Sequence, residues 1–287
     1  MELKIDLAGE ILRITGPDHE MFLEPGPLAP FITEEDRIDR EVTCGIVDEL
    51  SQPRGMCIYH DARRWVYRDG DADISYIGAV ADSADRAYIR TERQPGRTDI
   101  RVKRAALPSR ITSKTILNGL EAEHLAVARN GFLFHCSYID WQNSAILFTA
   151  PSGVGKSTQA ELWRRYRDAK IINGDRAVVR LGEKGVEAWG VPFSGSSGIS
   201  HRSCLPVKAI VCLSQAPKTT IRRLSGVRAF RSIWEGCSLH TWDRDDVTRC
   251  SETVLQVASQ VPVFHLACTP DESAVCALED ALSQIVR

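Results

Sequence analysis

The first third of the chain alternates short apolar runs with turn residues. The runs cover residues 3–14, 41–47, 56–60, 65–68, 74–80, 87–91 and 99–102. Gly70 and the pair Pro95-Gly96 interrupt them. Short runs bounded by Gly and Pro are typical of β-strands joined by tight turns. We therefore predict a β-rich N-terminal domain over residues 1–108, whose role as a scaffold, a substrate-recruiting module or an oligomerisation module stays open.

The rest of the chain mixes helical and strand periods. The spacing predicts helices over residues 113–130, 156–166 and 247–261, and strands over 132–138, 145–149, 207–213, 221–224 and 261–267. The strands 132–138 and 145–149 are expected to pair as a hairpin. Thr269-Pro-Asp-Glu272 has the pattern of a capping box with Pro at the first helical position, so a last helix is expected to run to residue 285. We predict an α/β domain over residues 109–287.

Two further apolar runs decide the kind of sheet. Residues 170–181 and 185–191 are joined only by a link around Glu183 and Lys184. A parallel crossover needs about a dozen residues or more, so these runs must form an antiparallel hairpin. The fold class predicted is therefore α/β with a mixed sheet, which excludes the all-parallel sheets of many nucleotide-binding proteins.

A phosphate-binding loop lies between the strand 145–149 and the helix 156–166. Its sequence, Ala150 to Thr158, is APSGVGKST, the Walker A or P-loop pattern with Ala150 in place of the first Gly. Ala is acceptable there unless the position needs a positive φ. Backbone N–H groups of such a loop and the following helix N-terminus surround phosphates. The residues expected to bind ATP are Ser152, Gly153, Val154, Gly155, Lys156, Ser157 and Thr158, with Lys156 on the β- and γ-phosphates and Ser157 on Mg²⁺.

Three other side chains are candidates for the same site. Asp175 interrupts a β-like run, where a charge is costly unless it meets a metal, a cation or a substrate. Glu187 lies on the partner strand of that hairpin and could be a second Mg²⁺ ligand. His135, on the strand before the loop, could relay a proton. The alternatives are an Asp at the hairpin edge facing water, a surface Glu and a core His. His265 is interpreted as a core residue.

A loop of small residues, 190–199, is a further candidate. Its serines offer hydroxyls and backbone donors, and it could hold a substrate or cover the phosphates. A plain linker is the alternative.

Composition narrows the classes of partner. The 287 residues carry a net charge of -2, which gives no basic footprint for nucleic acid. No run approaches the roughly 18 apolar residues of a transmembrane helix, and residues 1–10 do not have the pattern of a signal peptide. A cytoplasmic protein that binds neither nucleic acid nor membrane is expected. The nine cysteines contain no Cys-x-x-Cys pair and are interpreted as free thiols.

Together these motifs resemble a known family. Residues 113–287 are similar to the kinase domain of bacterial HPr kinase/phosphorylase and its smaller HPr-kinase-like relatives, whose fold resembles that of phosphoenolpyruvate carboxykinase. The similarity rests on His135 to Asp140, the phosphate loop, Gly174-Asp175 and Glu187-Ala-Trp-Gly190. By this resemblance Asp175 would act as base toward an acceptor hydroxyl, Ser157 and Glu187 would bind Mg²⁺, and His135 would lie beside the transferred phosphate. Relatives in the family are often homo-oligomers.

The sequence departs from the family pattern at two positions. Gly174 replaces the first of two adjacent Asp residues, and Trp189 stands where the HPr enzyme has Arg. HPr as substrate and phosphorylase activity therefore do not follow from the resemblance. The loop Pro192-Phe-Ser-Gly195 and the segment 261–272 are closer to relatives from peptide-modification settings, some of which phosphorylate Ser on a peptide or a small molecule.

The resulting hypothesis is an ATP- and Mg²⁺-dependent kinase that phosphorylates a hydroxyl, most simply a Ser, of a protein or peptide. Two alternatives stay open. One is a kinase for a small molecule such as free serine or another alcohol. The other is a catalytically degenerate nucleotide-sensing adaptor, in which the missing carboxylate at position 174 leaves binding without transfer.

Overall fold

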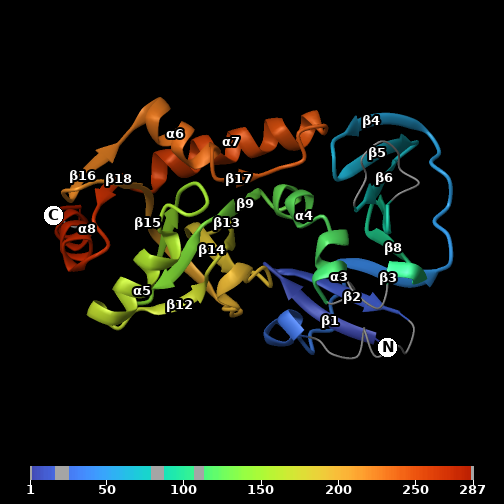
Figure 1. The fold of residues 1–287 in the computed structure, drawn as a ribbon, viewed down its shortest axis with the longest axis horizontal. Coiled ribbons are helices and arrows are strands. Elements are labelled where there is room, and N and C mark those ends of the chain that lie inside the picture. Colours follow the sequence, from blue (N-terminus) through green and yellow to red (C-terminus); the bar gives the residue numbers. More distant parts are fainter. Residues whose placement is uncertain (1, 17–25, 79–86, 107–112, 286–287) are drawn as a thin grey trace. The chain divides into compact units, whose positions relative to one another are not determined.

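The computed structural model describes residues 2–16, 26–78, 87–106 and 113–285. The chain divides into two compact units, residues 1–122 and 123–287. The domain boundary expected at 108/109 falls outside the described residues. The helix α3, Ser113–Gly119, contacts β7 and so belongs to the first unit. Each unit is described by itself below (Figure 1).

The first unit is built on one eight-stranded sheet in the order β1-β2-β3-β8-β7-β6-β5-β4. The strands are β1 Glu2–Leu7, β2 Glu10–Thr15, β3 Arg40–Val47, β4 Met56–His60, β5 Arg64–Asp69, β6 Ala72–Ile77, β7 Ile89–Gln94 and β8 Arg97–Lys103. Two short 3-10 helices, η1 Gly26–Phe31 and η3 Arg104–Ala106, accompany them. All pairs are antiparallel except β2 with β3 and β3 with β8. The β-rich pattern was therefore interpreted correctly.

One predicted run in this unit is two strands. Residues 3–14 fold back as the hairpin of β1 and β2, because Ala8 and Gly9 both adopt a positive φ. The backbone N–H of Gly9 donates to the carboxylate of Asp6 and holds this turn.

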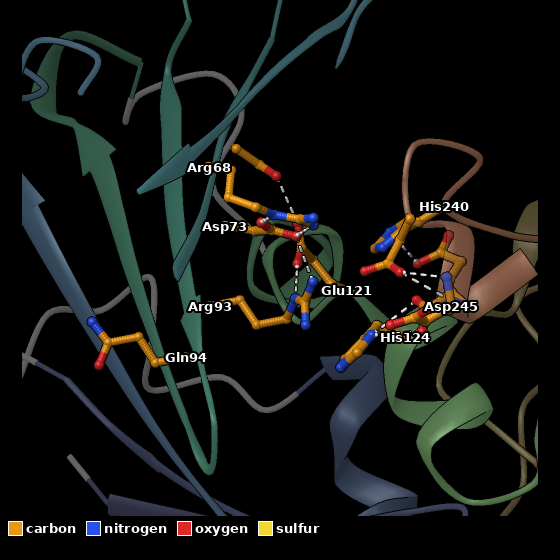
Figure 2. Close-up of polar contacts among 12 residues, drawn as sticks. Arg68, Asp73, Arg93, Gln94, Glu121, His124, His240 and Asp245 are labelled. Carbon is orange, nitrogen blue, oxygen red and sulfur yellow. Dashed lines mark hydrogen bonds and ion pairs between the residues drawn. The ribbon is translucent and has the colours of Figure 1, made fainter. Parts of the chain in front are cut away.

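A buried ion network joins the middle strands of the first unit (Figure 2). Asp73 on β6 is 5% exposed and accepts hydrogen bonds from Arg93 at 2.7 Å and from Arg68 at 2.8 and 3.0 Å. Glu121 accepts from Ser75 at 2.7 Å and from Arg93 at 3.2 Å. Buried charges with such partners fix the elements that carry them.

The second unit is a three-layer α/β structure. Its mixed sheet has the order β12-β10-β11-β15-β14-β13-β9-β17, and β18 pairs with β15 and β16. The strands are β9 Gly131–His135, β10 Ser137–Asp140, β11 Ala145–Thr149, β12 Lys170–Asn173, β13 Arg176–Gly182, β14 Gly185–Gly190, β15 Cys204–Gln215, β16 Thr220–Leu224, β17 Cys237–Ser238 and β18 Val263–Cys268. Only β11 with β15 and β15 with β18 pair in parallel among these described strands. The predicted mixed α/β sheet is confirmed.

Helices cover both faces of this sheet (Figure 1). They are α4 Ala122–Ala128, α5 Lys156–Arg167, α6 Gly226–Trp234, α7 Arg244–Gln260 and α8 Glu272–Ser283, with a 3-10 turn η4 at Gly195–Ser197. Alternate residues of β11 point to opposite faces: Phe148 packs in the core of α5 and α8, and Leu147 in that of α6 and α7. Period-2 alternation thus puts one apolar strand into two cores.

Three predicted boundaries in this part of the chain are wrong. The helix 113–130 is two helices, because Glu121 adopts a positive φ of 51° and its carboxylate is held by Arg93 and Ser75. The strand 132–138 breaks at Cys136, whose N–H donates to the carbonyl of Asp175, so that β9 pairs with β13 and β10 with β11. The hairpin partner of 145–149 is therefore residues 137–140 alone.

The run 170–181 also breaks, at Gly174-Asp175. The side-chain carbonyl of Asn173 accepts from the N–H groups of Asp175 at 2.8 Å and Arg176 at 3.0 Å, which replaces sheet pairing by a local turn. The antiparallel hairpin itself is present as β13 and β14.

The predicted capping box at residues 269–272 is wrong as well. Asp271 is the N-cap of α8 and accepts from the N–H of Ser273 at 2.9 Å, which leaves Pro270 outside the helix. The nine cysteines are free thiols, as expected.

Candidate functional site

The phosphate loop connects β11 to α5 at the edge where the parallel strands end. Gly153 and Gly155 have φ values of 81° and 126°, which side chains rarely tolerate. Ala150 does not adopt a positive φ, so Ala in place of the first Gly causes no backbone strain in the loop. Gly155 is the N-cap of α5 and makes no side-chain cap, so the first N–H groups of the helix face the loop. The strand, loop and helix order that a phosphate nest needs is present.

Lys156 begins α5 and folds back over the loop. Its side chain is largely buried, and the ammonium donates to the carbonyl of Ala150 at 3.0 Å. Burial lowers the pKa of Lys156, and the negative charge of Asp175 partly offsets that effect.

His135 and Asp175 meet beside the loop. The last residue of β9, His135, pairs with Arg176 at the start of β13, which places Asp175 next to the imidazole. His135 Nε2 lies 3.6 Å from Asp175 Oδ1, and the two side chains are 37% and 30% exposed. They are therefore neither core residues nor free surface residues. The hydroxyl of Thr149 donates to the carbonyl of His135 at 3.0 Å and ties this pair to the strand of the phosphate loop.

Burial and the charge of Lys156 disfavour the protonated form of the His135 imidazole. Burial lowers its pKa from the ordinary 6.5, the charge of Lys156 lowers it further, and Asp175 acts in the opposite direction. A neutral imidazole at pH 7 can accept a proton. The pair therefore offers two proton acceptors beside a lysine and a phosphate nest.

The structure does not bring Glu187 to this place. Glu187 pairs with Arg180 in the hairpin register, five residues beyond Asp175, which is roughly 16 Å along a strand at about 3.3 Å per residue. Its carboxylate forms an ion pair with Arg180 at 3.4 Å and accepts from Trp189 Nε1 at 3.2 Å. The expectation that the hairpin brings Glu187 to the phosphate loop is wrong, because the sequence gives the partner strand but not the distance along it.

The remaining oxygen donors fit Mg²⁺. Ser157 lies in the first turn of α5 with an exposed side chain, and Asp175 supplies a half-buried carboxylate. Hard oxygen donors of this kind are what Mg²⁺ prefers, together with phosphate oxygens and water. Ser157 and Asp175 thus offer oxygen donors of the kind that Mg²⁺ accepts.

The small-residue loop borders the same carboxylate. A Cβ on Gly195 would lie 2.8 Å from the Asp175 Cβ, so the loop backbone runs directly against this residue. A Cβ on Gly174 would lie 2.1 Å from Ser197 Oγ, so the loop occupies the space that a side chain at position 174 would need. Residues 195–198 are exposed. This loop is therefore a wall of the site.

A cavity of about 610 Å³ adjoins the phosphate loop, and no local sequence pattern predicts it. It is lined by Gly153, Val154, Gly155, Thr158, Gln159, Leu213, Ser214, Gln215, Ala216, Pro217, Cys268 and Pro270. Its floor is formed where β15 and β18 end. Ligands of open α/β sheets bind outside the carboxyl ends of parallel strands, so a correct prediction of the strand order would have indicated the position of this cavity.

His265, interpreted as a core residue, is half-buried on β18, and its Nε2 lies 3.1 Å from Ser214 Oγ.

A second group of titratable side chains lies between α4 and α7 (Figure 2). Single ligand atoms of His124, Asp243 and Asp246 lie within 4.8 Å of one another. His124 Nδ1 is 2.8 Å from Asp246, and Asp243 caps α7 by accepting from two backbone N–H groups. Asp243 thus caps α7, and His124 is paired with Asp246.

Comparison with solved structures finds distant likeness. No family model matches the chain, and no curated protein matches it. The HPr(Ser) kinase/phosphatase from Coxiella burnetii is a similar solved structure, with 9% sequence identity and a TM-score of 0.32 over 54% of this chain and 99% of that one. Among the described residues, no helix is both long and apolar enough to cross a membrane.

Proposed function

We propose that the second unit is an ATP- and Mg²⁺-dependent kinase that transfers the γ-phosphoryl group to a Ser hydroxyl of a protein or peptide. The observation that carries the proposal is the approach of His135 Nε2 to Asp175 Oδ1 beside a Gly-containing loop, which is followed by Lys156 at a helix N-terminus. Phosphoryl transfer needs little covalent chemistry from a protein and depends on positioning and charge neutralisation, which these groups supply.

Each of the residues beside the loop has a role in the transfer step. The acceptor oxygen attacks the γ-phosphorus while the bond to the β–γ bridging oxygen breaks, and ADP leaves with the electron pair. Asp175 accepts the hydroxyl proton, and His135, kept neutral, is placed 3.6 Å away to receive it or hold its orientation. The Lys156 ammonium neutralises charge on the transferred group. Ser157 and Asp175 would hold Mg²⁺, which would supply further charge neutralisation.

The wall next to Asp175 suits an acceptor that arrives from solvent. Residues 195–198 are exposed and carry small side chains, so a chain segment with a Ser can approach the carboxylate across them. Arg176 lies over the ring of Phe193 at 5.4 Å and fixes the start of this loop. An exposed approach favours a peptide or protein acceptor over a small molecule enclosed in a pocket.

The test is to follow the label from γ-labelled ATP. The protein is incubated with Mg²⁺ and, separately, with Ser-containing peptides, HPr, free serine and water as acceptors. We expect label on the hydroxyl of a peptide or protein, and none with Lys156→Ala. Label on free serine would mean that the acceptor is a small molecule and not a protein or peptide. Release of the label to water alone would overturn the kinase assignment.

A second candidate function is nucleotide sensing without transfer. The observation in its favour is the packing of Ser197 against Gly174, which leaves no space for a second carboxylate in the site. Such a protein would bind Mg-ATP and leave it intact with every acceptor. The same labelling experiment, combined with a direct measurement of ATP binding, separates the two functions.

A further inference from the structure

The two carboxylate oxygens of Asp175 face two different side chains. Oδ1 lies 3.6 Å from His135 Nε2, and Oδ2 lies 3.4 Å from Arg176 Nε. An arginine side chain in a protein keeps its positive charge at every ordinary pH. The carboxylate therefore stands between an imidazole and a permanent cation. The ion pair with Arg176 engages Oδ2 and leaves Oδ1 to meet the reacting groups.

The backbone that carries this ion pair is fixed by a buried side chain. Asn173 is 0% exposed, and its Oδ1 accepts from the N–H groups of Asp175 at 2.8 Å and Arg176 at 3.0 Å. Its Nδ2 donates to the carbonyl of Val191 at 2.6 Å. This turn sets the position of the Asp175 backbone but not the rotation of its carboxylate, because χ2 of Asp has a broad energy minimum. The neighbouring charges must set that rotation.

The side chain of Arg176 has supports of its own. Its Cζ lies 5.4 Å from the centroid of the Phe193 ring, within the range of a cation–π contact. Its Nη1 lies 4.0 Å from Glu123 Oε1 on α4. Glu123 Oε2 in turn lies 3.7 Å from Nε2 of His240, which is 3% exposed. A side chain that is held by other groups in this way can fix the orientation of its neighbour.

We propose that Arg176 is a positioning residue that holds the Asp175 carboxylate with Oδ1 toward the acceptor hydroxyl. The inference rests on the proposed function, because it assumes that Asp175 receives the hydroxyl proton. A general base works only when its oxygen lies within hydrogen-bond reach of the proton that it takes. Misplacement of a catalytic group by about 1 Å can lower a rate about 100-fold. In this role Arg176 acts through Asp175.

The experiment measures the steady-state transfer of phosphate from γ-labelled ATP to a Ser-containing peptide by the full-length protein. Arg176→Met removes the charge and keeps an unbranched apolar stem, whereas Arg176→Lys keeps the charge. We expect Arg176→Met to lower kcat about 100-fold. The KM for ATP should stay within about twofold, because the loop supplies the phosphate contacts. Arg176→Lys should be at least about tenfold faster than Arg176→Met, because an ammonium can still attract the carboxylate.

Arg180 provides a matched control on the same strand, β13. Its guanidinium makes the same two kinds of contact, an ion pair with Glu187 at 3.4 Å and a cation–π contact with the Trp189 ring at 4.3 Å. Arg180→Met removes both contacts at a distance from Asp175 and should leave kcat and KM unchanged.

Two further variants test the support and the folding. Glu123→Gln removes a charged support of Arg176 and should lower kcat by a smaller factor, about threefold. Arg176→Gln is a second neutral variant, polar where Met is apolar, and should behave as Arg176→Met does. Thermal unfolding of each variant shows that the protein is folded under the conditions of the assay.

The outcomes separate this inference from the proposed function. If the folded Arg176→Met and Arg176→Gln variants transfer phosphate at the wild-type rate, the positioning role is overturned and the kinase stands. Equal losses in Arg176→Met and Arg176→Lys would overturn it too, because a side chain that only packs against Phe193 does not depend on charge. A loss of the same size in Arg180→Met would show a general disturbance of β13 and also overturn it. If the wild type labels no hydroxyl, the proposed function fails and this inference fails with it.

Discussion

The two units use charge in opposite ways. In the first unit, Asp73 and Glu121 are almost fully buried and lie at hydrogen-bond distance from Arg93. In the second unit, His135 and Asp175 are about one third exposed, and their nearest atoms stand 3.6 Å apart. Tightly paired buried charges fix a fold, whereas loosely spaced and partly exposed charges leave room for a ligand.

This difference predicts which measurement each charge affects. A substitution in the network of Asp73 should change the free energy of unfolding and leave turnover alone. A substitution beside the phosphate loop should change turnover and leave the free energy of unfolding nearly unaltered. A result of the opposite kind at either place would break the comparison.

The largest effect is expected for Lys156→Ala. A cation on the transferring phosphoryl group is worth about 10³ to 10⁵ in rate, so phosphate transfer should fall by about 10⁴. Because the ammonium bonds only loop carbonyls and is costly to bury, unfolding should shift by less than about 1 kcal/mol. Labelled transfer and thermal unfolding measure the two effects. Lys170→Ala, at the exposed start of β12, is the control and should change neither.

Asp175→Asn is expected to have the next largest effect. The amide keeps the shape but cannot accept the hydroxyl proton, and general-base catalysis contributes about 10²- to 10⁴-fold, so transfer should fall by about 10³. ATP affinity should stay within about threefold, since the loop supplies most of the phosphate contacts. Asp168→Asn, at the exposed left-handed C-cap of α5, is the matched control. Normal transfer by Asp175→Asn would remove the base assignment.

In the first unit, Asp73→Ala should destabilise the fold by about 3 kcal/mol, because it leaves Arg93 buried without this partner. Denaturant unfolding measures the change. Asp69→Ala, which removes an exposed ion pair with Arg54, should cost less than about 1 kcal/mol. Phosphate transfer by Asp73→Ala should equal that of the wild type under conditions in which both units are folded.

The carboxylate of Asp73 should also make the free energy of unfolding depend on pH. Burial alone would raise the pKa of Asp73, but Arg68 and Arg93 outweigh that effect and lower it. The pair therefore contributes its full stability above the ordinary Asp pKa of about 3.9 and loses it as the pH falls through the lower folded value. The acid-induced loss of stability should be smaller in Asp73→Ala than in the wild type.

The sequence predicted the parts of the site that depend on local chemistry. The helix α5, the hairpin of β13 and β14, and the order of strand, loop and helix follow from period, link length and Gly positions, and the structure contains them. That the loop binds phosphate stays a prediction. Asp175 comes close to the loop because β9 and β13 pair in register. The loop, the helix and the hairpin need few long-range contacts, so a single sequence carries them, whereas the position of Asp175 depends on the long-range pairing of β9 with β13.

The features that the sequence missed depend on distant contacts. The break at Glu121 is set by Ser75 and Arg93, which lie 46 and 28 residues away along the chain. The cavity at Gln159 requires Cys268, 109 residues later, and the parallel ends of β15 and β18. No local sequence pattern predicts the break at Glu121 or the cavity at Gln159, because these residues become buried only when distant segments pack together in the folded protein.

The smallest effect, and the sharpest test of a shared environment, concerns the pKa of His135. It should lie below 6.5 in the wild type, because burial and the charge of Lys156 both disfavour the imidazolium. Lys156→Gln removes a positive neighbour and should raise this pKa, whereas Asp175→Asn removes a negative one and should lower it further.

NMR titration of the histidine side chains measures these shifts, with His135→Gln to assign the signal. His265, whose pKa is lowered by its own burial and by Arg222, is the internal control and should not move in either variant. Opposite shifts of the His135 pKa would show that the charges of Lys156 and Asp175 both influence His135. Residues that bind the same phosphate must lie close enough for such an influence. Shifts of the same sign in both variants would mean that the two substitutions merely loosen the packing around the imidazole. The residues beside the phosphate loop would then not form a coupled cluster to set against the buried network of the first unit.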